Sequence, residues 1–217
     1  MKLHRFRYSP YARKVQMLLD LLHIPHEIVE QSYGDREDLA RLTGGYIYVP
    51  VLIDDDGSVV VESRVICERI LSRPGAAERL LPSPQEGPIW AYADFIEGAL
   101  EDVLFRIAAP GVRDSWPTHF ERALYVLIKE RKFGAGCVEA WERDREALIS
   151  QGKKLLGPTL RTLSARPFPF GGTPTLADAA LYGQCAMLES ATPGLLVRLD
   201  PALAAFARRM EAATLNQ

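Results

Sequence analysis

The stretch VPVLIDDDGSVVVESRVICERI, residues 49–70, decides how the first part of the chain folds. Two runs rich in β-branched residues, 49–53 and 59–61, flank Asp56-Gly57, and an Asp-Gly turn between such runs is a strong hairpin signal. Ser63 then stands where a helix N-cap would, before apolar residues at helical spacing. The stretch therefore predicts a β-hairpin that leads directly into a helix.

Upstream of this hairpin, the sequence predicts a strand–helix–strand unit. Residues 2–8 alternate loosely over the length of a strand, and apolar residues within 15–22 recur at the spacing of one helix face. A second extended run follows at residues 26–29, and the connection is long enough for the two strands to pair in parallel. Residues 1–73 are thus expected to form a βαβ-ββα domain.

The residue pattern changes twice in the rest of the chain. Residues 74–88 are rich in proline and have no sustained period, which is typical of a linker. Residues 89–217 are helical in pattern, with one long apolar stripe over 89–107, and 176–188 is apolar nearly all round, which predicts a buried central helix. Further helices are expected around residues 124–128, over the charged segment 141–156 and after Asp200-Pro201. The fold class is an α/β domain followed by an all-α domain.

Composition excludes several classes of protein. Lys and Arg number 26 against 28 Asp and Glu, a formal net charge of −2, which offers no field for nucleic acid. No window approaches the roughly 20 apolar residues of a membrane span, and the N-terminus has no apolar targeting segment. The 3 cysteines form no CxxC pair, and the 4 histidines show no HExxH or HxH spacing. We expect a soluble cytoplasmic protein without a metal site.

The first candidate site is SPYARKV, residues 9–15, at the passage from strand to helix. Ser9 as N-cap with Pro10 behind it is ordinary helix-start chemistry. The same start offers unpaired N–H groups to an anion, and a hydroxyl there can donate to a sulfur anion and lower the pKa of the thiol. Arg13 could add positive charge or form a structural ion pair, and Tyr8 supplies a second hydroxyl.

Two further segments fit a peptide-like ligand. Pro50 inside an apolar run puts its strand at a sheet edge or breaks it, and it leaves the Val49 backbone free to pair with an extended ligand. A cis bond between the two residues would suit this pairing. Glu62 could hold an ammonium group, and Ser63 with the helix-start amides could hold a carboxylate, unless Ser63 is only a cap. Together the last two residues fit an α-amino acid head group.

In order along the chain, these segments resemble the cytosolic glutathione S-transferase superfamily. SPYARKV (9–15), VPVL (49–52) and ESRVI (62–66) look like its catalytic-helix, cis-proline and glutamyl-binding motifs. TLADAAL (175–181) looks like the helix-start motif of its C-terminal domain. The resemblance spans nearly the whole chain and implies a thioredoxin-like N-terminal domain, a linker and an all-helical C-terminal domain.

The resemblance also implies a role for each matched residue. Ser9 falls where serine-type members, theta- and zeta-like, place the hydroxyl that stabilises the glutathione thiolate. Val49 and Pro50 match the backbone segment that pairs with the cysteinyl unit of the tripeptide. Glu62 and Ser63 match the residues that hold its γ-glutamyl end.

Some other positions depart from the family pattern, and two match it in a structural role. Tyr48, at a glutathione contact, stands where many members carry Lys or Gln. Pro10-Tyr11 replace the serine-cysteine motif of the zeta isomerases, which argues against maleylacetoacetate isomerase. Ser9 in place of cysteine excludes thiol–disulfide exchange through that position. Thr175 and Asp178 match a capping box, which is structural.

The sequence therefore predicts a glutathione S-transferase that holds reduced glutathione, its co-substrate, as the thiolate through Ser9, with Tyr8 as the lesser alternative. The thiolate would attack a small hydrophobic electrophile in a detoxification reaction. The expected acceptor pocket between the domains takes aromatic residues: Tyr11, Trp90 and Phe95, with Tyr92, Phe105 and Trp116 as further candidates. A non-catalytic ligand-binding or protein-interaction module of the same fold is the alternative. The resemblance alone implies a homodimer.

Overall fold

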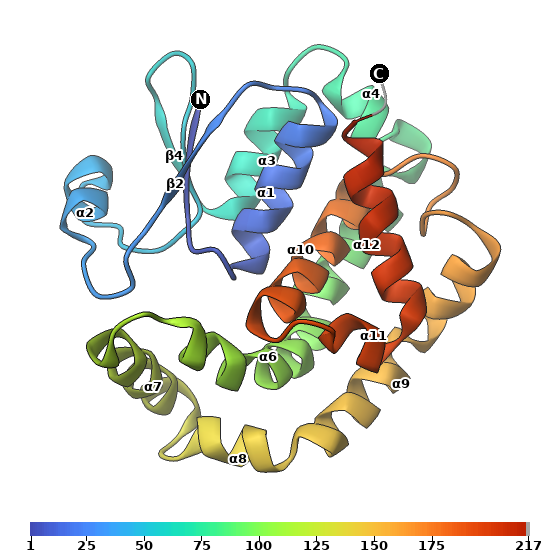
Figure 1. The fold of residues 1–217 in the computed structure, drawn as a ribbon. Helices are drawn as coiled ribbons and strands as arrows, with labels where there is room; N and C mark the ends of the chain where they lie inside the picture. The colour runs from blue at the N-terminus through green and yellow to red at the C-terminus, as the bar shows by residue number, and fades with distance from the viewer. Residues whose placement is uncertain (216–217) are drawn as a thin grey trace.

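A four-stranded sheet forms one side of the molecule in the computed structural model, which describes residues 1–215 (Figure 1). The strands are β1 (Lys2–Arg5), β2 (Glu27–Glu30), β3 (Val51–Ile53) and β4 (Val59–Val61), in the order β2-β1-β3-β4. The pair β1–β2 is parallel, with α1 (Pro10–Leu21) as the crossover, whereas β1–β3 and β3–β4 are antiparallel. The expected βαβ-ββα order is confirmed.

Helices cover both faces of this sheet. Helices α1 and α3 (Ser63–Leu71) lie on one face, and α2 (Glu37–Thr43) lies on the other side (Figure 1). Leu3 and Leu52 are opposite each other in the β1–β3 pair and are fully buried, as the alternation of side chains along strands requires.

The structure decides two local expectations. Strand β3 is interior to the sheet and begins at Val51, so of the two outcomes expected at Pro50, an edge strand or a broken one, the strand is broken there. The ladder starts after the residue that lacks an N–H. Ser63 is the first residue of α3, and the N-cap is Glu62, with φ 68°. Ser63 is therefore not a cap, and its hydroxyl serves another purpose.

The remaining helices form the second half of the molecule. The stretch 74–88 holds a short helix and a 3₁₀ turn, and its role as a linker stays a prediction. The segment 141–156, expected as one helix, belongs to two helices that meet at Asp144. The elements are α4 (Ala76–Leu80), a 3₁₀ turn (Ser83–Gln85), α5 (Glu86–Phe95), a π-helical turn η2 (Ile96–Leu100), α6 (Glu101–Ser115), α7 (His119–Phe133), α8 (Cys137–Arg143), α9 (Arg145–Ala165), α10 (Leu176–Ala191), α11 (Leu195–Leu199) and α12 (Pro201–Ala213).

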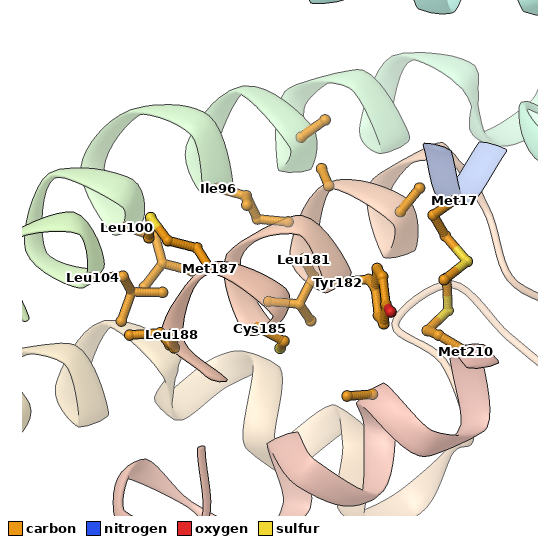
Figure 2. Close-up of a cluster of buried hydrophobic side chains, with 14 of the residues drawn as sticks. Met17, Ile96, Leu100, Leu104, Leu181, Tyr182, Cys185, Met187, Leu188 and Met210 are labelled. Atoms are coloured by element: carbon orange, nitrogen blue, oxygen red, sulfur yellow. The ribbon is translucent and has the colours of Figure 1, made fainter. Parts of the chain in front are cut away.

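Helix α10 is the centre of this half, as expected from its apolar sequence. Figure 2 shows its side chains packed against η2 and α6, and shows Met17 of α1 and Met210 of α12 next to Tyr182. Gly183 allows the close approach to α1, because a Cβ there would lie 2.3 Å from the carbonyl oxygen of Pro10. The start of α1 is thus held directly against the helical half.

The start of α10 carries the expected capping box. The backbone N–H and the hydroxyl of Thr175 both donate to Asp178 Oδ2, at 2.8 and 2.6 Å. Burial raises the pKa of Asp178 to about 6, against the hydrogen bonds from Thr175 that lower it. The side chains of Thr175 and Asp178 are buried within the protein and stabilise the start of α10.

The three cysteines, Cys67, Cys137 and Cys185, are buried as small apolar side chains. Within residues 1–215, no group of three His, Cys, Asp or Glu side chains gathers closely enough to hold a metal ion. In the same part of the chain, no helix combines the length and apolarity needed to cross a bilayer.

Candidate functional site

The start of α1 carries the first candidate residue. Ser9 is the N-cap, with its Oγ accepting from the N–H of Ala12 at 3.3 Å, and Pro10 is the first helical residue. Because the helix engages one lone pair of Oγ, the hydroxyl proton remains free to be donated elsewhere. The side chain is 6% exposed, so a ligand group beside it would be largely shielded from water. The N-cap prediction is confirmed.

Ser9 lies on the wall of a cavity of about 420 Å³ between the two halves of the molecule. The β1–α1 loop and the segment before β3 form one wall, and η2, α6 and α7 form the other. The residues that matter for the site are Ser9, Tyr11, Tyr48 and Val49 on the first wall, and Glu97, Glu101, Phe105, Lys129 and Phe133 on the second.

Val49 presents a free backbone to this cavity. The Val49–Pro50 peptide bond is cis, and Val49 makes no backbone hydrogen bond to any residue that the structure describes. Its N–H and C=O are therefore available to an extended ligand, as in β-augmentation. Tyr48 beside it is 62% exposed and packs edge-on against Tyr46, with ring centres 5.5 Å apart.

The start of α3 is the second place where an anion could bind. The first intrahelical bond joins the N–H of Ile66 to the carbonyl of Glu62 at 2.9 Å, so the N–H groups before it have no helical acceptor. The Ser63 hydroxyl accepts a hydrogen bond from Lys14 Nζ at 3.3 Å. The Glu62 carboxylate accepts one from the hydroxyl of Tyr46 at 3.1 Å.

The structure does not bring Arg13 to the Ser9 hydroxyl. Arg13 donates to Gln16 and lines a second, larger cavity, of about 1020 Å³, between α1 and helices α10 to α12. Tyr8 lies between the two cavities and packs against Trp116 and Tyr125. Burial raises the pKa of Tyr8 well above its usual value, and the neighbouring Tyr33 adds to this.

Only part of the expected acceptor pocket lines the cavity. Tyr11 does, but Trp90 lies under the guanidinium of Arg64, 3.8 Å from the ring centre, and Phe95 stacks on Tyr92. Trp90 and Phe95 both precede the π-helical turn η2 along the chain. Phe105 lies beyond the turn and lines the cavity, whereas Trp116 lines the larger one.

Sequence reasoning missed four charged residues at the site, all of them buried or half-buried. Burial raises the pKa of Glu101 to about 7, against hydrogen bonds from Tyr11 and Gln184 that lower it. Burial also lowers the pKa of Lys129 to about 8; its Nζ lies 4.9 Å from the ring centres of Phe105 and Tyr125.

The other two are Lys14 and Glu97, which form an ion pair at 2.5 Å. A signal for the acidic residues was present in the sequence. Glu97 and Glu101 are four residues apart on the polar side of the 89–107 stripe, which places them together on one helical face.

Two family models match the chain at both ends. The model for the Glutathione S-transferase, N-terminal domain, matches residues 3–78, and the one for the Glutathione S-transferase, C-terminal domain, matches residues 138–211. The chain belongs to the glutathione S-transferase superfamily. Within it, a rice protein (Oryza sativa subsp. japonica) named "Probable glutathione S-transferase" is 41% identical over 63 residues, which cover 29% of this chain and 26% of the relative.

Several solved structures share the fold of this chain at low identity. A fungal transferase of Phanerochaete chrysosporium has a TM-score of 0.82 at 16% identity, covering 98% of this chain and 96% of its own. A Ceriporiopsis subvermispora transferase in complex with glutathione reaches 0.81 at 17%, with the same coverage. Glutaredoxin 2 of Salmonella typhimurium, also in complex with glutathione, reaches 0.72 at 20%, covering 100% of this chain and 95% of its own.

Proposed function

We propose that this transferase-family chain binds reduced glutathione and activates it as the thiolate. The observation that carries the proposal is the placement of the Ser9 hydroxyl and the free Val49 backbone on one cavity wall, with the open start of α3 as an anion site. Ser9 would face the sulfur, Val49 the cysteinyl backbone, and Ser63 the γ-glutamyl carboxylate. The serine-type assignment is part of this proposal.

The chemistry needs one proton lost and one bond formed. The thiol of glutathione releases its proton to solvent, and the Ser9 O–H together with the positive end of α1 stabilises the sulfur anion. The thiolate then attacks the electrophilic atom of the acceptor, and the displaced electron pair leaves with a leaving group or takes up a proton. Phe105, Phe133 and Tyr11 provide the apolar wall for a small hydrophobic acceptor.

Wider features of the proposal come from family membership alone. We infer a cytoplasmic homodimer with a role in detoxification. Analytical ultracentrifugation checks the dimer directly, and a monomer at micromolar concentration would contradict it.

Binding and conjugation assays test the proposal. Calorimetry should detect glutathione binding at sub-millimolar to millimolar concentration, and ultraviolet difference spectra should show the bound thiolate at neutral pH. In the Ser9→Ala variant, binding should persist while the thiolate signal and the conjugation of an activated aryl halide fall about 100-fold. Ser150→Ala, at an exposed serine of α9, is the matched control. Normal conjugation by Ser9→Ala would remove Ser9 from the mechanism.

A non-catalytic module of the same fold is the second candidate. It is favoured by Tyr48, which is 62% exposed and stands at a glutathione contact where many members of the family carry Lys or Gln. No glutathione binding at millimolar concentration, with the fold intact by circular dichroism, would support the module over the enzyme.

A further inference from the structure

Lys14 is a fully buried lysine between the two candidate anion sites. Its side chain is only 1% exposed, although lysine is almost never fully buried unless it is paired. Its Nζ forms an ion pair with Glu97 at 2.5 Å and donates a hydrogen bond to Ser63 Oγ at 3.3 Å. One ammonium group of α1 therefore contacts both the start of α3 and the π-helical turn of the helical half.

Glu97 makes the burial of this charge tolerable. Burial by itself lowers the pKa of Lys14, but the neighbouring Cys67 and Glu97 outweigh it, so that the pKa lies above its ordinary value and Lys14 stays charged. An ion pair of this kind is close to neutral, so it adds little long-range field. What it adds at Ser63 is a donor held in a fixed position.

That donor decides what the Ser63 hydroxyl can do. A hydroxyl has one proton to give and two lone pairs to accept with, and an ammonium group can only donate. Because Lys14 donates to Oγ, the proton of Ser63 must point elsewhere. Ser63 is the first residue of α3, and the unbonded N–H groups of that helix start lie next to it. The hydroxyl is therefore set to donate at the place where those N–H groups also donate.

We propose that Lys14 is a positioning residue for a ligand carboxylate at the start of α3, acting by turning the Ser63 hydroxyl proton toward it. The inference rests on the proposed binding of glutathione, whose γ-glutamyl α-carboxylate is the group concerned. It assigns the positive group of the site to Lys14 rather than to Arg13, which lines the other cavity. It also makes Glu97, on the wall of the acceptor cavity, a contributor to glutathione affinity.

Calorimetry on a mutant cycle tests the proposal. The double variant Lys14→Met/Glu97→Gln removes both charges together, so that no unpaired carboxylate is left buried. It should weaken glutathione binding about tenfold, close to the loss in Ser63→Ala, as expected for one charge-assisted hydrogen bond. Adding Ser63→Ala to the double variant should weaken glutathione binding by less than about a further twofold, because Lys14 acts only through Ser63.

A second thiol separates positioning from general stabilisation of the fold. Cysteinylglycine lacks the γ-glutamyl unit, and its kcat/KM in conjugation should be unchanged in the double variant. Lys14→Gln retains an N–H donor without the charge and should lose less than about threefold in glutathione affinity. Lys153→Met, at an exposed lysine of α9, is the control and should bind as the wild type does.

The outcomes are distinguishable. If the wild type binds no glutathione at millimolar concentration, the proposed function fails and this inference fails with it. Two results would overturn this inference alone, with the wild type binding glutathione. Either the losses of glutathione affinity multiply in the triple variant, or the double variant loses as much kcat/KM with cysteinylglycine as with glutathione. In both cases Lys14 would only hold the two halves of the molecule together. A Lys14→Gln variant that binds glutathione as weakly as the double variant would likewise overturn it, since charge and not the hydrogen bond to Ser63 would then matter. Circular dichroism and melting curves check that each variant is folded. If the double variant does not fold, the glutathione affinity of Lys14→Gln tests the inference in its place.

Discussion

The two helix starts of the candidate site look alike in sequence and differ in structure. At α1, Ser9 stands outside the helix as its cap, and the helix itself supplies the donor to Oγ from Ala12. At α3, Ser63 stands inside the helix, and the donor to Oγ comes from Lys14 on another element. In both cases an internal donor occupies the oxygen, which leaves the hydroxyl proton for an anion. The same outcome is reached by local capping in one case and by tertiary contact in the other.

The difference predicts that the two serines control different kinetic quantities. Ser9→Ala should lower kcat about 100-fold with little change in KM, because the Ser9 hydroxyl acts on the charge at sulfur, which changes during the reaction. Ser63→Ala should raise KM about tenfold with kcat nearly unchanged, because a remote carboxylate is bound equally in both states. Steady-state kinetics with varied glutathione measures both. Equal effects of the two variants on kcat would contradict the comparison.

Packing at the α1 start gives the next largest effect. Gly183→Ala would put a methyl group 2.3 Å from the Pro10 carbonyl oxygen, which is backbone and cannot rotate away. Overpacking of this kind should cost about 2 kcal/mol of stability and disturb Ser9 before it disturbs Ser63. Denaturant unfolding measures the loss. Gly87→Ala in α5, where nothing lies within 4 Å of an added Cβ, is the control and should be neutral or stabilising.

A pH titration sharpens the role of the acidic face opposite these helix starts. Burial raises the pKa of Glu101 from 4.5 to about 7, so the folded protein holds this proton more tightly than the unfolded chain does. The wild type should therefore lose stability as the pH rises from about 4.5 through 7, and Glu101→Gln should lack the part of this loss that comes from Glu101. The difference in unfolding free energy between the two should shift by about 1.3 kcal/mol between pH 6 and pH 8. Parallel pH profiles of the two proteins would contradict the buried position of Glu101.

The start of α12 has a cap with no part in the proposed reaction, so its loss gives the smallest expected effect and serves as the reference for Ser9→Ala. At α12, Asp200 Oδ1 accepts from the N–H of Ala202 at 2.8 Å, with Pro201 as the first helical residue, the same arrangement as Ser9-Pro10. Asp200→Ala should cost about 1 kcal/mol of stability and leave both kcat and KM unchanged. Thermal melts and kinetics of this variant, beside those of Ser9→Ala, separate the loss of a cap from the loss of catalysis. A fall in kcat for Asp200→Ala would show that capping alone explains the effect at Ser9.

Local patterns predicted most of the fold because their causes are local. The Asp-Gly hairpin, the Ser9-Pro10 helix start, the apolar α10 and the Thr175–Asp178 box each depend on residues within a few positions of one another, and each was found. The features that the sequence left open or placed elsewhere depend on distant partners. The interior place of β3 is set by its pairing with β1 and β4, and Trp90 lies under Arg64 of α3 instead of on the cavity wall.

The sequence by itself determined the βαβ-ββα order of the first domain, the two serine helix starts and the proline segment between them, because capping, turn chemistry and periodicity depend on neighbouring residues. Only the tertiary structure decided that Arg13 lines the other cavity and that Glu62 rather than Ser63 occupies the N-cap position of α3. It also decided that Glu97, Glu101 and Lys129 line the candidate cavity, with Lys14 paired to Glu97. The physical reason is burial. A charged side chain inside a protein needs a partner, and its partner here comes from an element 83 positions away, between Lys14 and Glu97.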